Sequence, residues 1–210
     1  FQRADKSLVA VDQVDEKADG TFVEKLTGGV VVRIIAKMSK SLKNVENPDD
    51  VIQNYGADTF RLYEMYMGPL EASKPWNTKD ISGLYRFLQR AWRLVVDEET
   101  GKLRTAASES ADVEKLLHRT IARVETDIER LAFNTAIAGL IEFVNAASAA
   151  GGLSKSQVNR FARILGPFAP HMAEEIWDKL GEQPSIAHAA WPTYEAAMLT
   201  TGKQMTSLTR

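Results

Sequence analysis

Two lysines and two serines in one short loop are the residues of this sequence best suited to chemistry. They form the run Lys37-Met38-Ser39-Lys40-Ser41, just before a segment with helix-forming features. Two ammonium groups at this spacing can hold a polyphosphate, and serine hydroxyls and backbone N–H groups can donate to phosphate oxygens. The alternative is a solvated lysine loop without a ligand, because lysine and serine are common at protein surfaces.

The chemistry that suits this loop is the departure of a phosphate leaving group from a triphosphate. When the bond to such a leaving group breaks, negative charge accumulates on it. A mobile loop with two positive charges can then stabilise the transition state more than the ground state. Lys37 and Lys40 are therefore the candidate catalytic residues, and Lys43 would add a third positive charge nearby. The candidate triphosphate-binding residues are Lys37, Met38, Ser39, Lys40 and Ser41.

The composition is that of an ordinary folded chain and excludes several kinds of site. The 210 residues are 44% hydrophobic and 26% charged with a net charge of −2, so any RNA contact must come from local patches. The absence of cysteine excludes disulfides and thiolate metal sites. His118, His171 and His188 are far apart in sequence, and we expect no metal site. No apolar run approaches the ~20 residues of a membrane span, and a cytoplasmic location is expected.

The elements that must position the lysine loop differ on its two sides. Residues 21–26 and 30–35 have the alternation or the β-branched side chains of short strands, whereas the polar stretch 12–20 is expected to be loop. After the loop, Pro48 suits the first position of a helix, and Asp58 is expected to cap the next one.

Amphipathic helices joined by short loops follow, and this pattern predicts an antiparallel helical bundle. The expected fold is therefore mainly α, with a short N-terminal segment of strand and loop and then the lysine loop before the bundle. Leu131, Trp92 and Trp177 are expected in its core. The expected helices cover 81–97 and 112–131, then run from a cap at Asn134 to the break at Gly151, from Ser154 to Gly166, and from Pro170 to Gly181.

A row of arginines on the first bundle helix is a candidate RNA contact. Arg86, Arg90 and Arg93 share one face of that helix, opposite its apolar stripe. Arginines at this spacing could pair with successive phosphates of an RNA backbone. A solvated helix face is an equally good reading, and the residues alone do not decide between the two.

The lysine loop reads KMSKS, which is the signature loop of class I aminoacyl-tRNA synthetases. Residues 37–97 resemble the bacterial leucyl-tRNA synthetase family, and the run 63–71 followed by Lys74-Pro75-Trp76 separates them from the valyl, isoleucyl and methionyl enzymes. The segments 133–137 and 167–177 look like the helical anticodon-binding-type domain of the same family.

This resemblance implies a division of the chain into four parts. Residues 1–36 would end the leucyl-specific insertion, and residues 37–77 would hold the KMSKS loop and the stem-contact helices. Residues 78–199 would form the anticodon-binding-type bundle, and residues 200–210 would be a disordered tail.

The resemblance also implies a reaction and its partners. Leucine and ATP would give leucyl-adenylate, and leucine would then pass to the terminal ribose of tRNA(Leu). Lys40 would contact ATP with Lys37 assisting, and the bundle would dock along the tRNA. Mg²⁺ would accompany ATP, bound mainly outside this segment. A monomer is expected.

The sequence departs from the family at two points. Family members often carry Lys-Gly or Arg-Gly after KMSKS, whereas this chain has Leu42-Lys43. Because lysine adopts positive φ less easily than glycine, a stiffer loop is expected. The chain also begins at Phe1 without the His-x-Gly-His motif of the nucleotide-binding half or the editing domain.

We therefore expect a fragment that alone neither activates leucine nor edits mischarged tRNA. The alternative is a non-enzymatic RNA-binding paralogue that kept the bundle and lost the chemistry. The intact pair of KMSKS lysines favours the enzyme, because a pure binding module does not need two lysines that face a triphosphate.

Overall fold

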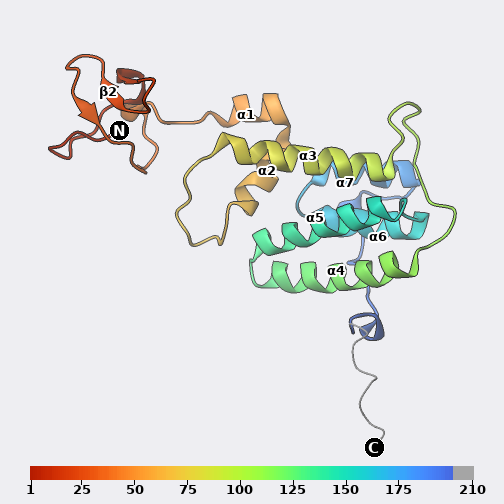
Figure 1. The fold of residues 1–210 in the computed structure, drawn as a ribbon. Helices are drawn as coiled ribbons and strands as arrows, with labels where there is room; N and C mark the ends of the chain where they lie inside the picture. The colour runs from red at the N-terminus through yellow and green to blue at the C-terminus, as the bar shows by residue number, and fades with distance from the viewer. Residues whose placement is uncertain (201–210) are drawn as a thin grey trace, which may run out of the picture. The chain divides into compact units, whose positions relative to one another are not determined.

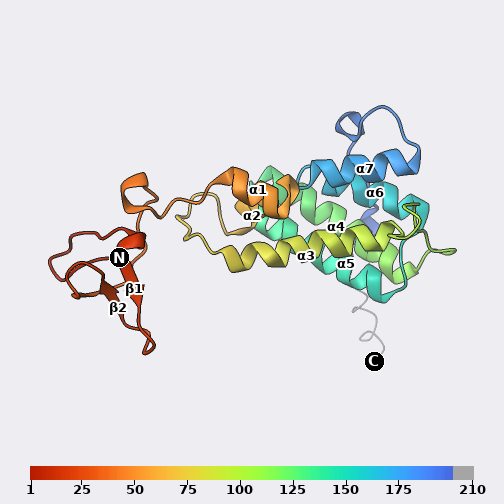
Figure 2. The ribbon, with the colours of Figure 1, turned by 90° about the horizontal axis from the view of Figure 1, so that it is seen from above.

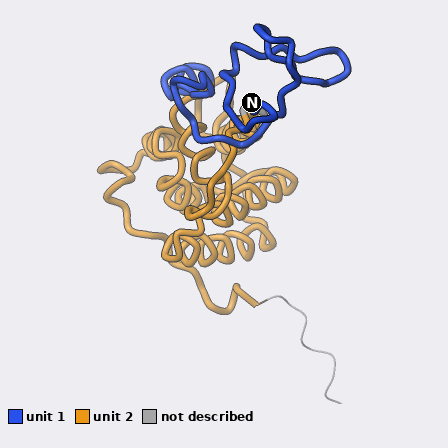
Figure 3. The backbone as a smooth tube through the Cα atoms, turned by 90° about the vertical axis from the view of Figure 1, so that its left-hand side faces the viewer, with its two compact units in different colours: residues 1–54 blue, residues 55–210 orange. Residues whose placement is uncertain are grey.

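The chain divides into two compact units, residues 1–54 and residues 55–210 (Figure 3). The structure, a computed structural model, describes residues 1–200, apart from the side chains of residues 78 and 79. Within that part, the fold is mainly α with one small antiparallel sheet, as expected. The predicted tail 200–210 lies, from residue 201 onward, outside the described residues.

The first unit contains a three-stranded antiparallel sheet in the order β1-β2-β3. Its strands are β1 (Val14–Glu16), β2 (Phe22–Glu24) and β3 (Val30–Val31), with Val14 opposite Glu24 and Phe22 opposite Val31. The loop predicted over residues 12–20 was therefore wrong in part. Strand β1 pairs through its backbone at the sheet edge, where polar side chains can stay in solvent, so its sequence has no apolar alternation.

Besides the sheet, this unit contains two 3₁₀-helices and one α-helix that ends at its boundary. The 3₁₀-helix η1 (Val11–Gln13) leads directly into β1, and the 3₁₀-helix η2 (Lys40–Leu42) lies within the lysine loop. Helix α1 (Pro48–Tyr55) begins at the predicted proline, with Asp49 and Asp50 in its first turn.

The second unit is a bundle of α-helices (Figures 1 and 2). Helix α5 lies between α3 and α4 and also packs against α2, while α6 packs against α7 and α4. Phe143 of α5 and Phe161 of α6 are fully buried, with ring centroids 5.4 Å apart. The helices are α2 (Ala57–Tyr66), α3 (Thr78–Val95), α4 (Ala111–Glu129), α5 (Phe133–Ala149), α6 (Lys155–Leu165) and α7 (Pro170–Leu180).

The caps of the last two α-helices are those predicted from the sequence. Ser154 accepts a hydrogen bond from the Gln157 N–H, and the Gln157 side chain accepts one from the Ser154 N–H, which makes a capping box. Pro170 is at the first turn of α7, and Gly181 ends this helix in the left-handed conformation. These starts and stops are confirmed.

Two expectations at the junction of α4 and α5 were wrong. Helix α5 begins at Phe133 after Ala132, so Asn134 is inside the helix rather than its cap. Leu131 has φ of 55° and is 58% exposed, although the stripe of α4 predicted it in the core. The connection between α4 and α5 is short. Leu131 therefore adopts the left-handed conformation that ends α4, and its side chain points to solvent.

Two further residues of the bundle depart from prediction. Asp58 lies inside α2, whose N-cap is Gly56 with φ of 86°, so it does not cap its own helix. Trp92 is half-buried rather than in the core, and the Lys179 ammonium lies 5.8 Å from its ring centroid. Trp177 is buried as expected, and its indole N–H donates to the Pro184 carbonyl at 2.8 Å.

Candidate functional site

The lysine loop is an extended segment closed by one tight turn. Ser39 is extended, with φ of −153°, and η2 follows directly. Lys43 then turns the chain with φ of 50° and ψ of 34°, the left-handed conformation. The loop therefore reaches the backbone shape that glycine would favour, with a lysine in that place.

The Asn44 side chain braces the loop from its C-terminal side. Its Oδ1 accepts the Ser39 N–H at 2.8 Å, and its Nδ2 donates to the Lys37 carbonyl at 3.4 Å. The hydroxyls of Ser39 and Ser41 are 2.6 Å apart. The two serines that could donate to phosphate are thus gathered before any ligand binds. Sequence reasoning did not assign this part to Asn44, although an amide side chain after a lysine–serine turn is a signal for it.

The positive charges of the loop differ in their availability. Lys37 and Lys40 are exposed, and neither forms an ion pair with any described carboxylate. Lys43, by contrast, donates to Asp12 Oδ2 at 2.6 Å. This hydrogen bond raises the pKa of Lys43 and lowers the pKa of Asp12. Lys37 and Lys40 can therefore bind an anion without first breaking an ion pair, whereas the charge of Lys43 is already paired with that of Asp12.

The arginine row on α3 is exposed, but its members are not equivalent. The Nε of Arg93 lies 3.0 Å from both carboxylate oxygens of Glu98. Arg86 and Arg90 are exposed and form no ion pair with a described residue. The structure brings the three onto one solvent-facing side of α3, as predicted, and their contact with RNA stays a prediction.

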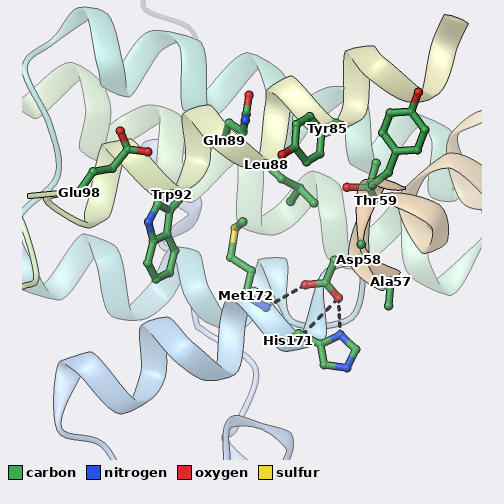
Figure 4. A pocket seen from close by; sticks show the side chains of 12 residues that line it. Ala57, Asp58, Thr59, Tyr85, Leu88, Gln89, Trp92, Glu98, His171 and Met172 are labelled. Atoms are coloured by element: carbon green, nitrogen blue, oxygen red, sulfur yellow. Dashed lines mark hydrogen bonds and ion pairs between the residues drawn. The ribbon is translucent and has the colours of Figure 1, made fainter. Parts of the chain in front are cut away.

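A pocket of about 400 Å³ opens between helices α2, α3 and α7 of the second unit (Figure 4). Tyr85 and Trp92 line it from α3, and Met172 lines it from α7. Asp58 accepts backbone N–H groups from His171 at 3.3 Å and Met172 at 2.8 Å, and lies 2.9 Å from His171 Nδ1. Asp58 therefore caps α7, a helix more than a hundred residues away, which no local pattern could reveal.

A partly buried polar cluster joins α4 to α6, and sequence reasoning missed it. Glu114 accepts two hydrogen bonds from Arg160, at 2.7 and 2.9 Å, and one from the Gln157 amide at 2.8 Å. Hydrogen bonds from Arg160 lower the pKa of Glu114 from 4.5 to about 2, against the opposing effect of burial. His118 Nδ1 accepts the Glu195 N–H, so its Nε2 donates to Glu114 at 3.0 Å. A signal existed in the Glu114–His118 spacing of four residues.

Two sequence families match the chain on either side of its middle. The family described as "tRNA synthetases class I (I, L, M and V)" matches residues 21–74, which include the lysine loop. The family described as "Anticodon-binding domain of tRNA ligase" matches residues 111–209. The leucine–tRNA ligase of Mycobacterium sp. (strain KMS) is 46% identical over 197 residues, which are 93% of this chain and 20% of that protein. The chain belongs to the leucyl-tRNA synthetase family.

A further relative supports the same family. The leucine–tRNA ligase of Saccharopolyspora erythraea is 50% identical over 188 residues, which are 88% of this chain and 19% of that protein. The chain therefore spans about a fifth of the length of the curated relatives that it matches.

A solved structure is similar in fold to this chain. It is the ternary complex of Agrobacterium radiobacter K84 agnB2 LeuRS-tRNA-LeuAMS. The TM-score is 0.66 at 29% sequence identity, over 78% of this chain and 23% of that one. The arginine row of α3 falls between the two segments matched by the sequence families.

Two negative findings concern the described part of this segment. It holds no group of three or more carboxylate or imidazole side chains that could bind a metal ion. No helix among the same residues is long and apolar enough to cross a membrane.

Proposed function

We propose that this chain is the part of a leucine–tRNA ligase that supplies the ATP-binding KMSKS loop and the helical bundle that docks tRNA(Leu). The observation that carries the proposal is the loop itself. It presents the exposed side chains of Lys37 and Lys40, which form no ion pair with a described carboxylate, in the same loop as two serine hydroxyls that lie 2.6 Å apart. The family membership supports leucine as the amino acid and tRNA(Leu) as the acceptor.

In the proposed first step, a carboxylate oxygen of leucine attacks the α-phosphorus of ATP. A P–O bond forms, the bond to the β-phosphate oxygen breaks, and pyrophosphate leaves with the electron pair of that bond. Lys37 and Lys40 neutralise the charge that grows on the departing oxygens, and Ser39 and Ser41 donate hydrogen bonds to them. Because these interactions strengthen as the charge develops, the loop accelerates the step more than it tightens ATP binding.

In the proposed second step, a terminal ribose hydroxyl of tRNA(Leu) attacks the leucyl carbonyl. The ester bond forms, the hydroxyl loses its proton to solvent, and AMP leaves with the electrons of the broken anhydride bond. The bundle holds the tRNA during this step, with Arg86 and Arg90 contacting backbone phosphates and Arg93 joining them after leaving Glu98. The described residues do not fit a Mg²⁺ site of their own, so we assign the metal that accompanies ATP no ligand here.

We propose that the isolated chain neither activates leucine nor edits tRNA, because it spans about a fifth of a leucine–tRNA ligase. We expect the complete ligase to be a cytoplasmic monomer.

The test is ATP–pyrophosphate exchange by the full-length ligase that contains this segment. Leucine, valine, isoleucine and methionine are compared, with and without Lys40→Ala, and Lys102→Ala serves as an exposed-lysine control in a loop of the bundle. We expect exchange with leucine alone and a fall of roughly 10²–10³-fold in Lys40→Ala, as for the removal of one donor to the transition state. Exchange with another amino acid would overturn the leucine specificity. No exchange at all from a folded protein would favour the RNA-binding paralogue.

A further inference from the structure

Lys43 occupies a backbone conformation that lysine rarely adopts. Its φ is 50°, in the left-handed region that favours glycine, and it stands immediately after the turn of the KMSKS loop. Such a residue persists only where its surroundings hold it in place. The contacts of Lys43 should therefore show what fixes the loop.

The backbone N–H of Lys43 donates to the Lys40 carbonyl at 3.3 Å, and its side-chain contact comes from 31 residues earlier in the chain. Its Nζ lies 2.6 Å from Oδ2 of Asp12, a residue of η1. Asp12 is itself anchored, because the Lys25 ammonium donates to its carbonyl oxygen at 2.8 Å, and the Lys25 N–H donates to the neighbouring Gln13 carbonyl at 2.8 Å. These two hydrogen bonds hold Asp12 at the edge of the small sheet. The KMSKS loop is therefore tied to a structured part of the unit.

The ion pair is exposed, so its value is in position rather than in stability. The side chain of Lys43 is 64% exposed and that of Asp12 is 48% exposed. Exposed ion pairs add little to the free energy of unfolding. They can nevertheless select one of several loop shapes that have nearly equal energies.

The loop beyond Lys43 depends on the direction in which the backbone leaves it. Asn44 follows directly, and its side chain bonds both the Ser39 N–H and the Lys37 carbonyl. If Lys43 left the left-handed region, the Asn44 side chain would swing away from both partners. Asp12, Lys43 and Asn44 therefore form a continuous path from the sheet to the two serines.

We propose that Asp12 and Lys43 are positioning residues, whose ion pair holds the left-handed turn and thereby presents Asn44 to the KMSKS loop. The consequence for ATP rests on the proposed function, but the effect on loop structure does not. Lys43 is then not a third phosphate ligand, because Asp12 neutralises its charge.

The first experiment uses the chain as it is. Hydrogen–deuterium exchange of peptides covering residues 37–44 is compared in Asp12→Ala, Lys43→Ala and the double variant. We expect exchange in this segment to rise several-fold in each single variant and no further in the double variant, since both remove one interaction. Unchanged exchange in both single variants would overturn the proposal.

Matched controls separate the pair from general effects of charge and backbone. Asp19→Ala removes another carboxylate of the same unit, which accepts the Thr21 N–H at 2.9 Å. Lys6→Ala removes a second lysine with positive φ, at 69°, in the same unit. Neither should change exchange in residues 37–44. Lys43→Gly should perturb the loop less than Lys43→Ala, because glycine keeps the turn accessible without the ion pair. An equal or larger effect of Lys43→Gly would contradict the backbone part of the proposal.

The second experiment measures the KM for ATP in leucine-dependent exchange by the full-length ligase. Positioning predicts that Asp12→Ala and Lys43→Ala raise this KM in the same direction and without additivity. A direct phosphate contact by Lys43 predicts opposite signs, because Asp12→Ala would release the ammonium and lower the KM. Opposite signs would overturn the proposal. Absence of exchange in the unmodified ligase would instead count against the proposed function, while the loop exchange data still decide on the pair.

Discussion

Each of the two compact units of this chain is stabilised internally by a different kind of interaction. The bundle of residues 55–200 buries continuous apolar stripes, and side chains such as Ile121, Leu140 and Phe143 have no exposed surface. In residues 1–54 the buried apolar side chains are few: Val9, Val23, Val31 and Val51. Large apolar side chains are instead exposed there, namely Leu8, Val11, Leu26, Val30, Val32, Ile35, Met38, Val45 and Ile52.

Polar contacts take over where apolar packing is sparse. The carboxylate of Glu24 accepts two hydrogen bonds from Arg3, at 2.9 and 2.6 Å, and one from Thr27 at 2.8 Å. The hydrogen bonds from Arg3 and then Thr27 hold the pKa of Glu24 at about 2. Asp12 and Asn44 likewise hold the KMSKS loop through polar contacts. The KMSKS loop is therefore shaped by a few replaceable polar contacts, whereas the bundle is shaped by packing.

The largest effect should come from the core of the bundle. Phe143→Ala removes a fully buried ring that packs on Phe161. We expect a loss of about 3–5 kcal/mol in the free energy of unfolding, from reduced burial and the cavity left behind. Denaturant unfolding followed by circular dichroism measures this loss. Hydrogen exchange in residues 14–31 should stay unchanged, and a parallel rise there would contradict the separation of the two units.

A smaller effect should come from the one polar cluster described above inside the bundle. The pKa of Glu114 is about 2 in the fold against an ordinary 4.5, a difference equivalent to at most ~3 kcal/mol, which solvent screening of this partly exposed carboxylate reduces. Because the folded pKa is the lower one, this stability is present above pH 4.5 and is lost as the pH falls toward 2. Arg160 and Gln157 of α6 and His118 of α4 face the carboxylate, and all three lose their anionic partner on protonation.

Glu114→Gln is the matched variant for this pH dependence. The chain with glutamine should be less stable at pH 7 and should lose less stability between pH 4.5 and 2. Thermal unfolding across that range measures both. An equal slope in the two proteins would show that other carboxylates carry the acid sensitivity.

The smallest effect should come from the arginine row. Replacing Arg86, Arg90 and Arg93 by glutamine should weaken tRNA(Leu) binding by the full-length ligase without unfolding the bundle. The salt slope should fall by roughly one for each phosphate that the variant no longer binds. Arg93→Gln alone should matter least, because Glu98 already neutralises Arg93. Filter binding over a range of salt concentrations tests this, and an unchanged slope would return the row to a solvated helix face.

The sequence predicted the features that depend on local pattern. The bundle helices, the Ser154 cap and the Gly181 stop follow from periodicity and capping chemistry, which act within a few residues. The KMSKS lysines could be proposed for the same reason, since their chemistry is in their own side chains.

The sequence could not reveal contacts between distant segments. Asp58 was assigned to the nearest helix start, but the start that it caps is brought to it by tertiary packing. The Asp12–Lys43 pair and the Glu114 cluster are likewise products of the fold. Lys43 itself was expected to resist positive φ, yet it adopts this conformation with its N–H bonded to the Lys40 carbonyl and its side chain paired with Asp12.

The most direct test of the proposed role of the KMSKS loop is a single-turnover measurement of leucyl-adenylate formation by the full-length ligase with Lys40→Ala. The rate constant and the Kd for ATP are measured separately, because Lys40 is proposed to act in the transition state. We predict that the rate constant falls by roughly 10²–10³-fold and that the Kd changes by less than about tenfold. A Kd for ATP that rises while the rate constant is unchanged would contradict this role, because Lys40 would then stabilise only the ground state.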